Sequence, residues 1–181
     1  MGDSISAAYG IAAEQGWVSL LQARLRTQGY GYRVVNASVS GETTEGGRNR
    51  LPRALQRHRP AIVIIELGGN DGLRGLPLDT TRANLAQMIK LSRRAGARVV
   101  LLGMRLPPNY GEEYGNAFAA LYAELAQSPD VELVPFFLDG VALEPGMMQP
   151  DGLHPGAAAQ ATLLQNAWPK LKILLSKAKA K

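Results

Sequence analysis

Residues 61–72 read AIVIIELGGNDG, an apolar run that passes directly into a glycine-rich turn. In the run 61–67 apolar residues follow one another instead of alternating with polar ones, which is typical of a strand buried on both faces of a parallel sheet. Runs 34–39 and 98–103 have the same character, and 131–135 is a weaker example. Together these segments predict a parallel sheet that is covered on both faces.

The segments between the predicted strands have helical patterns. Apolar residues recur at helical spacing early in the chain, at Trp17, Leu20, Leu21 and Leu25. Gly29 is expected to end this helix, and the residue before Pro60 must end the next one. Four further helices are expected at about 45–58, 80–95, 115–127 and 155–176. Pro155 suits the first turn of the last one. Because strands and helices alternate, the sequence predicts an α/β protein with a three-layer α/β/α arrangement, in a single domain over residues 1–181.

The composition excludes several kinds of functional site. The 181 residues include no cysteine, so disulfides, thiolate catalysis and cysteine-bound zinc are excluded. The sequence has 2 histidines and no H-E-x-x-H pattern, which argues against a protein-built transition-metal site. The net charge is +5, but the basic residues are scattered, and we interpret the Lys-rich stretch 170–181 as a solvated helix end, so no nucleic-acid partner is expected. No apolar run approaches the ~20 residues that span a membrane, and no signal peptide is visible.

Four glycine-containing motifs carry candidate chemistry. GDSIS at 2–6 presents Ser4 on a polar turn, as a nucleophile is presented, although a plain turn or helix cap is the alternative. SGETT at 40–44 follows a predicted strand, and Gly41 lets the backbone approach a ligand and offers its N–H to an anion, unless the motif only caps the next helix. GGNDG at 68–72 follows the most apolar strand. Asn70 can aim its side-chain amide at an oxyanion there, the alternative being turn chemistry alone.

The motif DGLHP at 151–155 is the most specific of the set. Asp151 lies three residues before His154 across a glycine turn, so its carboxylate can accept the imidazole N–H. This bond fixes the tautomer that leaves the other ring nitrogen free as a base. The alternative is an ordinary loop before the last helix.

In this order the blocks GDSIS, SGET, GGND and DGLHP resemble those of the SGNH (GDSL) hydrolase superfamily. More narrowly, the chain is similar to the bacterial multifunctional thioesterase I, lysophospholipase and arylesterase group. The similar stretches are GGNDGLRG at 68–75, RLPPNYG at 105–111, VPFFLDGV at 134–141 and MQPDGLHP at 148–155.

The resemblance implies a role for each motif residue. Ser4 is the expected nucleophile with Asp151 and His154 as its catalytic partners, and Ser4, Gly41 and Asn70 are the expected oxyanion hole. The resemblance also implies a flavodoxin-like strand order, 2-1-3-4-5. One departure is Glu42, where aspartate is common, and it should not affect the chemistry if the Gly41 backbone is what matters.

The activity implied is hydrolysis of acyl esters and thioesters (aryl esters, acyl-CoA, lysophospholipids) without a metal or organic cofactor. Apolar residues on two loops are expected to form an acyl-binding rim, with ordinary loop packing as the alternative: Leu73, Leu76, Leu106, Pro107, Pro108 and Tyr110. The alternative functions are a carbohydrate acetyl-esterase of the same superfamily and a non-catalytic flavodoxin-like binding domain. The resemblance implies contact with a lipid substrate and a periplasmic or secreted location, with the cytoplasm as the alternative.

No strand precedes Ser4 in the sequence, although the implied order places the first strand between 34–39 and 61–67. Without it, neighbouring N–H and C=O groups would lack partners, at about 1–3 kcal/mol for each buried group. We therefore expect upstream residues in the natural protein that supply this strand and an export leader. A structure of residues 1–181 should have an open slot between the two segments, or a substitute that fills it.

Overall fold

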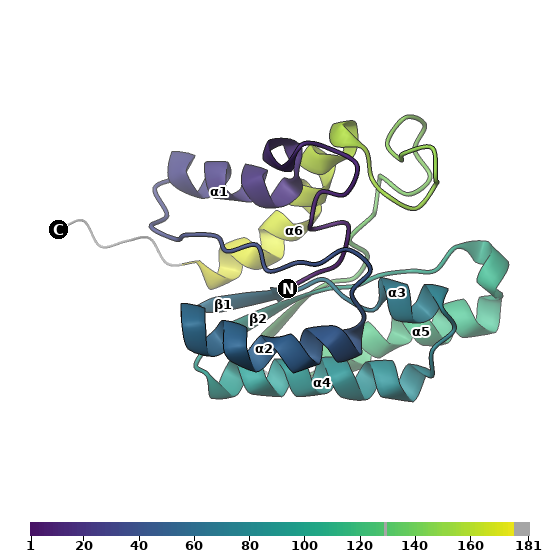
Figure 1. Ribbon diagram of the computed structural model, residues 1–181, viewed down its shortest axis with the longest axis horizontal. Helices are drawn as coiled ribbons and strands as arrows, with labels where there is room; N and C mark the ends of the chain where they lie inside the picture. The colour runs from purple at the N-terminus through teal and green to yellow at the C-terminus, as the bar shows by residue number, and fades with distance from the viewer. Residues whose placement is uncertain (129, 176–181) are drawn as a thin grey trace.

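A parallel sheet lies at the centre of the protein in the computed structural model, which describes residues 1–128 and 130–175 (Figure 1). The sheet has three strands in the order β1-β2-β3: β1 (Ile62–Ile65), β2 (Arg98–Leu102) and β3 (Val131–Val134). Val99 pairs with Val63 on one side and Val131 on the other. Apart from Arg98, every residue of β2 is buried, which explains why this strand has a continuous apolar sequence.

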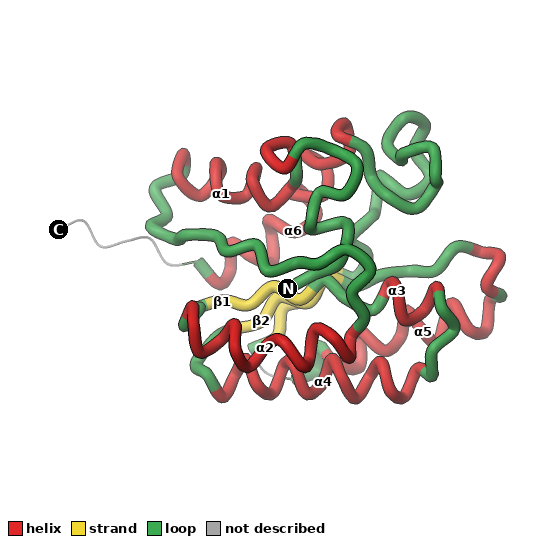
Figure 2. The backbone as a smooth tube through the Cα atoms, viewed as in Figure 1, coloured by secondary structure: helices red, strands yellow, loops and turns green. Residues whose placement is uncertain are grey.

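Helices cover both faces of the sheet (Figures 1 and 2). One face carries α1 (Trp17–Thr27) and α6 (Gln160–Leu174). The other face carries α2 (Thr44–His58), α4 (Leu78–Arg94) and α5 (Glu112–Leu125). The predicted α/β class and its three layers are therefore confirmed. Among the described residues, no helix is long and apolar enough to cross a membrane.

Several predicted boundaries agree with the structure. α1 is followed by Gly29 at φ +76°, and α2 ends before Arg59, which has φ 43°. The last helix begins later than expected, because α6 starts at Gln160 after a short 3-10 turn at Ala157–Ala159. Pro155 lies outside the helix, where its carbonyl accepts hydrogen bonds from two glutamine side chains. The predictions for residue 176 and for the end of the Lys-rich stretch lie outside the described residues.

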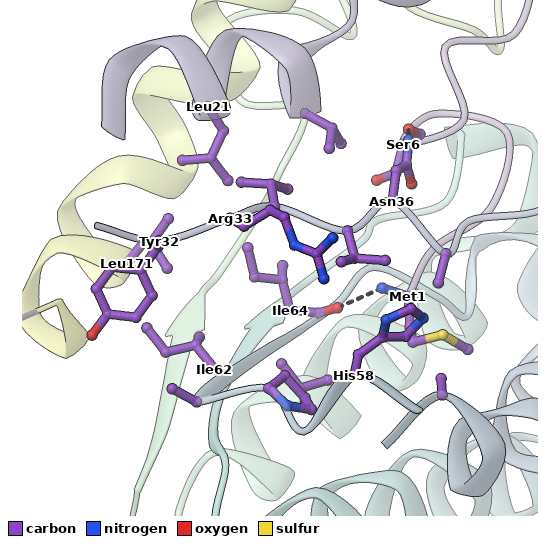
Figure 3. Close-up of a pocket in the computed structure, with 18 of the residues that line it drawn as sticks. Met1, Ser6, Leu21, Tyr32, Arg33, Asn36, His58, Ile62, Ile64 and Leu171 are labelled. Carbon is purple, nitrogen blue, oxygen red and sulfur yellow. Dashed lines mark hydrogen bonds between the residues drawn. The ribbon is translucent and has the colours of Figure 1, made fainter. Parts of the chain in front are cut away.

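The prediction of a strand at 34–39 is wrong. This segment is extended, but it is not part of the sheet. Met1 and Gly2 lie between it and the end of β1 (Figure 3). Gly2 forms an isolated parallel bridge with Glu66, and its carbonyl accepts the Val39 amide at 3.0 Å. At the other end of the segment, the Val34 amide donates to the Gln22 side chain instead of to a strand. The expected slot is present as a groove of about 350 Å³ between 31–38 and β1.

The observed strand order agrees with the last three positions of the predicted order 2-1-3-4-5. Within 1–128 and 130–175, no strand occupies the first two positions. The predicted loop 68–72 also differs, because Gly69–Leu73 forms a short helix, α3, after Gly68 at φ +113°. α3 and the turns after β1, β2 and β3 lie at the carboxyl edge of the sheet, where ligands bind in folds of this class.

Candidate active site

Ser4 lies in a tight turn directly after the two residues that pair with the end of β1. The Asp3 carbonyl accepts the Ala7 amide, and the Ser4 carbonyl accepts the Tyr9 amide, each at 3.0 Å. The Asp3 carboxylate accepts the Ile5 amide at 3.0 Å, which closes the turn around Ser4. Ser4 is nearly buried, with 9% of its surface exposed.

His154 and Asp151 complete a continuous hydrogen-bonded chain with Ser4. The His154 Nε2 atom lies 2.8 Å from Ser4 Oγ, and its Nδ1 atom lies 2.6 Å from Asp151 Oδ2. The other oxygen of Asp151 accepts the amides of Leu153 and His154. Because Gly152 is at φ +69°, the turn can fold back so that one carboxylate makes all three bonds.

These bonds stabilise the ionised form of Asp151. The hydrogen bond from the His154 ring, followed by those from the His154 and Leu153 amides, lowers the pKa of Asp151 to about 2. An ionised carboxylate at this position orients the imidazole and stabilises it when it is charged. The pair is therefore arranged for a base that receives a proton from Ser4.

Gln149 joins the turn of His154 to the turn of Ser4. Its backbone N–H donates to the His154 carbonyl at 2.7 Å. Its side chain donates to the Tyr9 carbonyl at 2.8 Å and to the Pro155 carbonyl at 3.1 Å. The Tyr9 ring also packs on the His154 ring, with 4.6 Å between centroids. Sequence reasoning quoted Gln149 within a motif but gave it no role, because its partners lie in distant turns.

Gly41 and Asn70 lie next to each other at the same edge. The Asn70 side-chain amide donates to Asp3 Oδ2 at 3.2 Å and to the Glu42 carbonyl at 3.1 Å, so it bridges the Ser4 turn and the Gly41 turn. Gly41 is at φ +76°, which a side chain would disfavour. In the described part of the chain, the amides of Ser4 and Gly41 have no hydrogen-bond partner, so both are available to an anion.

The Glu42 carboxylate, which departs from the common pattern, pairs away from the reacting atoms. Its Oε2 atom accepts from Arg50 at 2.6 Å. The Glu42 side chain therefore does not interact with the Gly41 amide, which is the group expected to bind the oxyanion.

Asp71, the residue after Asn70, holds the surrounding elements together. Its carboxylate accepts both the amide and the hydroxyl of Thr44, at 2.9 Å and 2.5 Å, and the hydroxyl of Thr81 at 3.4 Å. Asn84 donates to the same Thr44 hydroxyl. Thus α2, α3 and α4 meet at one buried carboxylate, which fixes the loop that carries Gly41. The sequence motif gave Asp71 no role of its own, because its partners Thr44 and Thr81 lie far away in sequence.

Two buried carboxyl groups lie behind Ser4. Glu66 Oε2 accepts the Ser6 hydroxyl at 2.8 Å and the Asp3 amide at 3.3 Å, while among the described residues Glu66 Oε1 has no partner. Burial raises the pKa of Asp3 to about 6, and burial together with the nearby Asp3 raises the pKa of Glu66 well above its usual value. Two close carboxyls do not easily ionise together, so the nearby Asp3 adds to the effect of burial on the pKa of Glu66. On its other side, Asp3 Oδ2 accepts the hydrogen bond from the Asn70 side chain.

The two loops of the predicted rim lie side by side. The Tyr110 hydroxyl donates to the Leu73 carbonyl at 2.9 Å, and the Tyr114 hydroxyl donates to the Leu76 carbonyl at 3.3 Å. Arg74 also donates to the Gly41 carbonyl at 3.1 Å, which links this loop to the site. Three further rim residues differ in burial: Leu106 and Pro107 are half-buried, and Pro108 is exposed. Leu76 is 37% exposed, so the structure leaves apolar surface at the rim.

Known proteins similar to this chain have related chemistry. Residues 1–162 match the GDSL-like Lipase/Acylhydrolase family. The chain is 57% identical over 175 residues to Esterase TesA of Pseudomonas aeruginosa, an alignment that covers 97% of this chain and 87% of that protein. It is 45% identical over 160 residues to Thioesterase 1/protease 1/lysophospholipase L1 of Escherichia coli, covering 88% of this chain and 76% of that protein. A crystal structure of TesA superposes with a TM-score of 0.94 at 57% identity, covering 96% of this chain and 97% of the other. The resemblance predicted from the sequence is thus confirmed, and the chain belongs to the GDSL-like lipase/acylhydrolase family.

Proposed function

We propose that the protein hydrolyses acyl esters and thioesters through an acyl-enzyme on Ser4. The observation that carries the proposal is the continuous chain from Asp151 through His154 to Ser4, with bonds of 2.6 Å and 2.8 Å. This is the geometry in which a serine hydroxyl is activated by a base that a carboxylate orients. The names of the relatives, an esterase and a thioesterase/lysophospholipase, support the same reaction class.

In the first step, Ser4 Oγ attacks the acyl carbonyl carbon and its proton passes to His154 Nε2. A carbon–oxygen bond forms, the carbonyl π electrons move to the oxygen, and Asp151 stabilises the imidazolium. When the tetrahedral intermediate collapses, the bond to the alcohol or thiol breaks, and the leaving group takes the proton from His154. Water then attacks the acyl-enzyme along the same proton path and releases the acid and free Ser4.

The developing oxyanion is held by the amides of Ser4 and Gly41 and by the Asn70 side chain, each donor contributing about 3 kcal/mol of barrier lowering. Both Asn70 hydrogens already have acceptors, Asp3 and Glu42. A charged oxygen is a stronger acceptor than a neutral carbonyl. We therefore infer that the Asn70 amide gives up its hydrogen bond to the Glu42 carbonyl and donates to the oxyanion instead. Its bond to Asp3 keeps the amide directed at the site.

The proposed substrates carry medium to long acyl chains, as in aryl esters, acyl-CoA and lysophospholipids. Exposed apolar surface at Leu76 and the adjoining loop with Tyr110 supports this preference. Contact with a lipid substrate and a periplasmic or secreted location belong to the proposal as well, and they rest on the family resemblance.

A substrate panel tests the proposal directly. Nitrophenyl esters of two-carbon to sixteen-carbon acids are compared with thioesters of the same acids. The proposal predicts hydrolysis of both ester and thioester series, with kcat/KM highest for chains longer than acetate. Activity confined to acetate would favour a carbohydrate acetyl-esterase instead, and no turnover of any member would contradict the proposal.

A further inference from the structure

Tyr9 presents a partly exposed aromatic ring directly beside the catalytic base. The ring packs on the His154 imidazole, with 4.6 Å between centroids and 41° between the ring planes. Tyr9 is nevertheless 53% exposed, so the imidazole covers only part of it. The open part of the ring can pack against a bound molecule.

The backbone on both sides of Tyr9 holds the residue in place. Its N–H donates to the Ser4 carbonyl at 3.0 Å, and its carbonyl accepts the Gln149 side chain at 2.8 Å. The residue before it, Ala8, has φ 60°, and the residue after it, Gly10, has φ +75°. A left-handed conformation is uncommon for alanine, and such residues are found often at functional sites. Tyr9 is therefore fixed by two bends and two hydrogen bonds, although its side chain is exposed.

The place of Tyr9 decides which part of a substrate it can reach. In the proposed reaction, on which this inference rests, the leaving group takes its proton from His154 Nε2, so its oxygen must come within about 2.6–3.2 Å of that nitrogen. The acyl rim lies elsewhere, because Arg74 of that loop bonds to the Gly41 carbonyl on the oxyanion side. Tyr9 packs on His154 instead. The leaving group is therefore the part of the substrate that comes next to the Tyr9 ring.

The two segments that meet at Tyr9 lack basic residues. Neither 1–23 nor 136–169 contains a lysine or an arginine. The same segments contain exposed acidic residues: Glu14, Asp139, Glu144 and Asp151. An acidic surface repels a leaving group that carries phosphates or carboxylates. The charge distribution therefore favours a leaving group without negative charge.

We propose that Tyr9 forms a leaving-group subsite that selects uncharged aromatic alcohols. The aromatic ring of the leaving group packs on the open part of the Tyr9 ring. When the tetrahedral intermediate collapses, the carbon–oxygen bond breaks, its electron pair stays on the alcohol oxygen, and the proton from His154 neutralises that oxygen. Among the proposed substrates, aryl esters fit this subsite best.

The alternative is that Tyr9 only orients the imidazole. His154 acts as the base a second time, when water attacks the acyl-enzyme after the alcohol has left. A ring that only orients His154 would affect both steps, whereas a leaving-group subsite affects acylation alone. Two esters of one acid form the same acyl-enzyme, so a difference between their kcat/KM values reports acylation.

The test compares benzyl hexanoate with cyclohexylmethyl hexanoate, whose leaving groups are similar in size but differ in aromaticity. We expect Tyr9→Leu to lower the ratio of kcat/KM for the benzyl ester over the cyclohexylmethyl ester about 2- to 10-fold, and Tyr9→Phe to retain it, because one aromatic pair is lost only in the first. Deacylation, measured in single turnovers with 4-nitrophenyl hexanoate, should keep its rate in Tyr9→Leu. Tyr110→Leu, on the acyl rim, provides the control and should leave the ratio unchanged.

Two further measurements use the unaltered protein. Benzyl alcohol should inhibit at a lower concentration than cyclohexylmethanol, a comparison that does not depend on the folding of a variant. The 4-carboxybenzyl ester should have a lower kcat/KM than the benzyl ester at low ionic strength, because its charge meets the acidic surface.

An unchanged ratio in Tyr9→Leu, or deacylation that slows as much as acylation, would overturn the proposal. Equal inhibition by the two alcohols, or a preference for the 4-carboxybenzyl ester, would also overturn it. Hydrolysis of the two uncharged esters with no such selectivity would leave the proposed function intact. Failure of the unaltered protein to hydrolyse either ester or the 4-nitrophenyl ester would contradict the proposed function itself, and the subsite with it.

Discussion

At the residue scale, the account depends on how Asp151 is ionised. Its pKa is lowered to about 2, mainly by the hydrogen bond with His154. A carboxylate whose folded pKa is depressed stabilises the fold above its unfolded pKa, and this contribution is lost as the pH falls through about 2. The Asp151–His154 pair should therefore remain intact through mildly acidic pH.

A carbon NMR titration of the Asp151 carboxyl checks this pKa. We expect a midpoint near 2 in the unaltered protein and a shift toward the ordinary aspartate value in His154→Ala, because the largest cause of the depression is then removed. A midpoint near 4 in the unaltered protein would contradict the geometry of the pair.

In the same series, Asp151→Asn should lower kcat by roughly 10³-fold or more, because an amide stabilises the wrong imidazole tautomer.

Asn70 should act on the reaction and not on substrate affinity. Asn70→Ala is expected to lower kcat about 100-fold or more with a smaller change in KM, because the oxyanion exists only in the transition state and the intermediate. Asn49, an exposed asparagine on α2, provides the matched control when it is changed to alanine. Unchanged turnover in Asn70→Ala would remove this residue from the oxyanion hole.

Asp3 should make stability depend on pH in a predictable direction. Its folded pKa, about 6, lies above the ordinary value of 3.8, so its contribution is present below 3.8 and is lost as the pH rises through about 6. The Met1 ammonium acts in the opposite sense, because its pKa is lowered from 8.0 to about 6. The informative quantity is therefore the difference between Asp3→Asn and the unaltered protein.

Urea unfolding between pH 4 and 7 measures that difference. As the pH rises, Asp3→Asn should lose less free energy of unfolding than the unaltered protein does, and Glu66→Gln provides the comparison at the neighbouring carboxyl. Parallel curves for Asp3→Asn and the unaltered protein would show that Asp3 does not titrate in this range.

At the element scale, the two rim loops form one unit because Tyr110 bonds to the Leu73 carbonyl. Leu76→Ala and Tyr110→Phe should therefore change the preference for acyl length, by at most about 10- to 200-fold in the ratio of kcat/KM values for long and short esters. Tyr114→Phe, which removes the longer bond to Leu76, provides the control for losing a hydroxyl. An unaltered chain-length profile in both Leu76→Ala and Tyr110→Phe would leave the rim as ordinary loop packing.

The elements also show why some structure was predictable from the sequence. β2 is buried on both faces except at Arg98, and β1 alternates between buried and half-buried residues, so both strands have continuous apolar sequences. α3 was missed because five residues that include glycines carry no helical periodicity. The segment 34–39 has strand-like residues, but it becomes a strand only if another strand lies beside it, which no local pattern reveals.

The same distinction applies to the candidate site. Ser4, Asp151 and His154 lie in short motifs whose spacing indicates their chemistry. Gln149 and Asp71 hold those motifs through partners in other turns and helices. A hydrogen bond between distant segments leaves no pattern in a single sequence, so such positioning residues became visible only in the fold.

At the scale of the whole molecule, the groove between 31–38 and β1 lies next to the segment that carries Ser4. Met1 and Gly2 pair at the groove's inner end, and the chain then turns directly into Ser4. Asn70 donates to Asp3, which lies between Gly2 and Ser4. Gln149 donates to the Tyr9 carbonyl and so holds the His154 turn against the turn of Ser4. The position of the nucleophile therefore depends on contacts from all parts of the chain, including the strand-like start at the edge of β1.

The central claim is that Ser4 is the nucleophile, and covalent labelling tests it most directly. After treatment with an organophosphonate, intact mass should increase by one adduct per chain, and peptide mapping should place that adduct on Ser4. The label should be absent in Ser4→Ala and present in Ser19→Ala, which changes an exposed serine on α1. An adduct that persists in Ser4→Ala, or a protein that takes no label while it hydrolyses esters, would contradict the account.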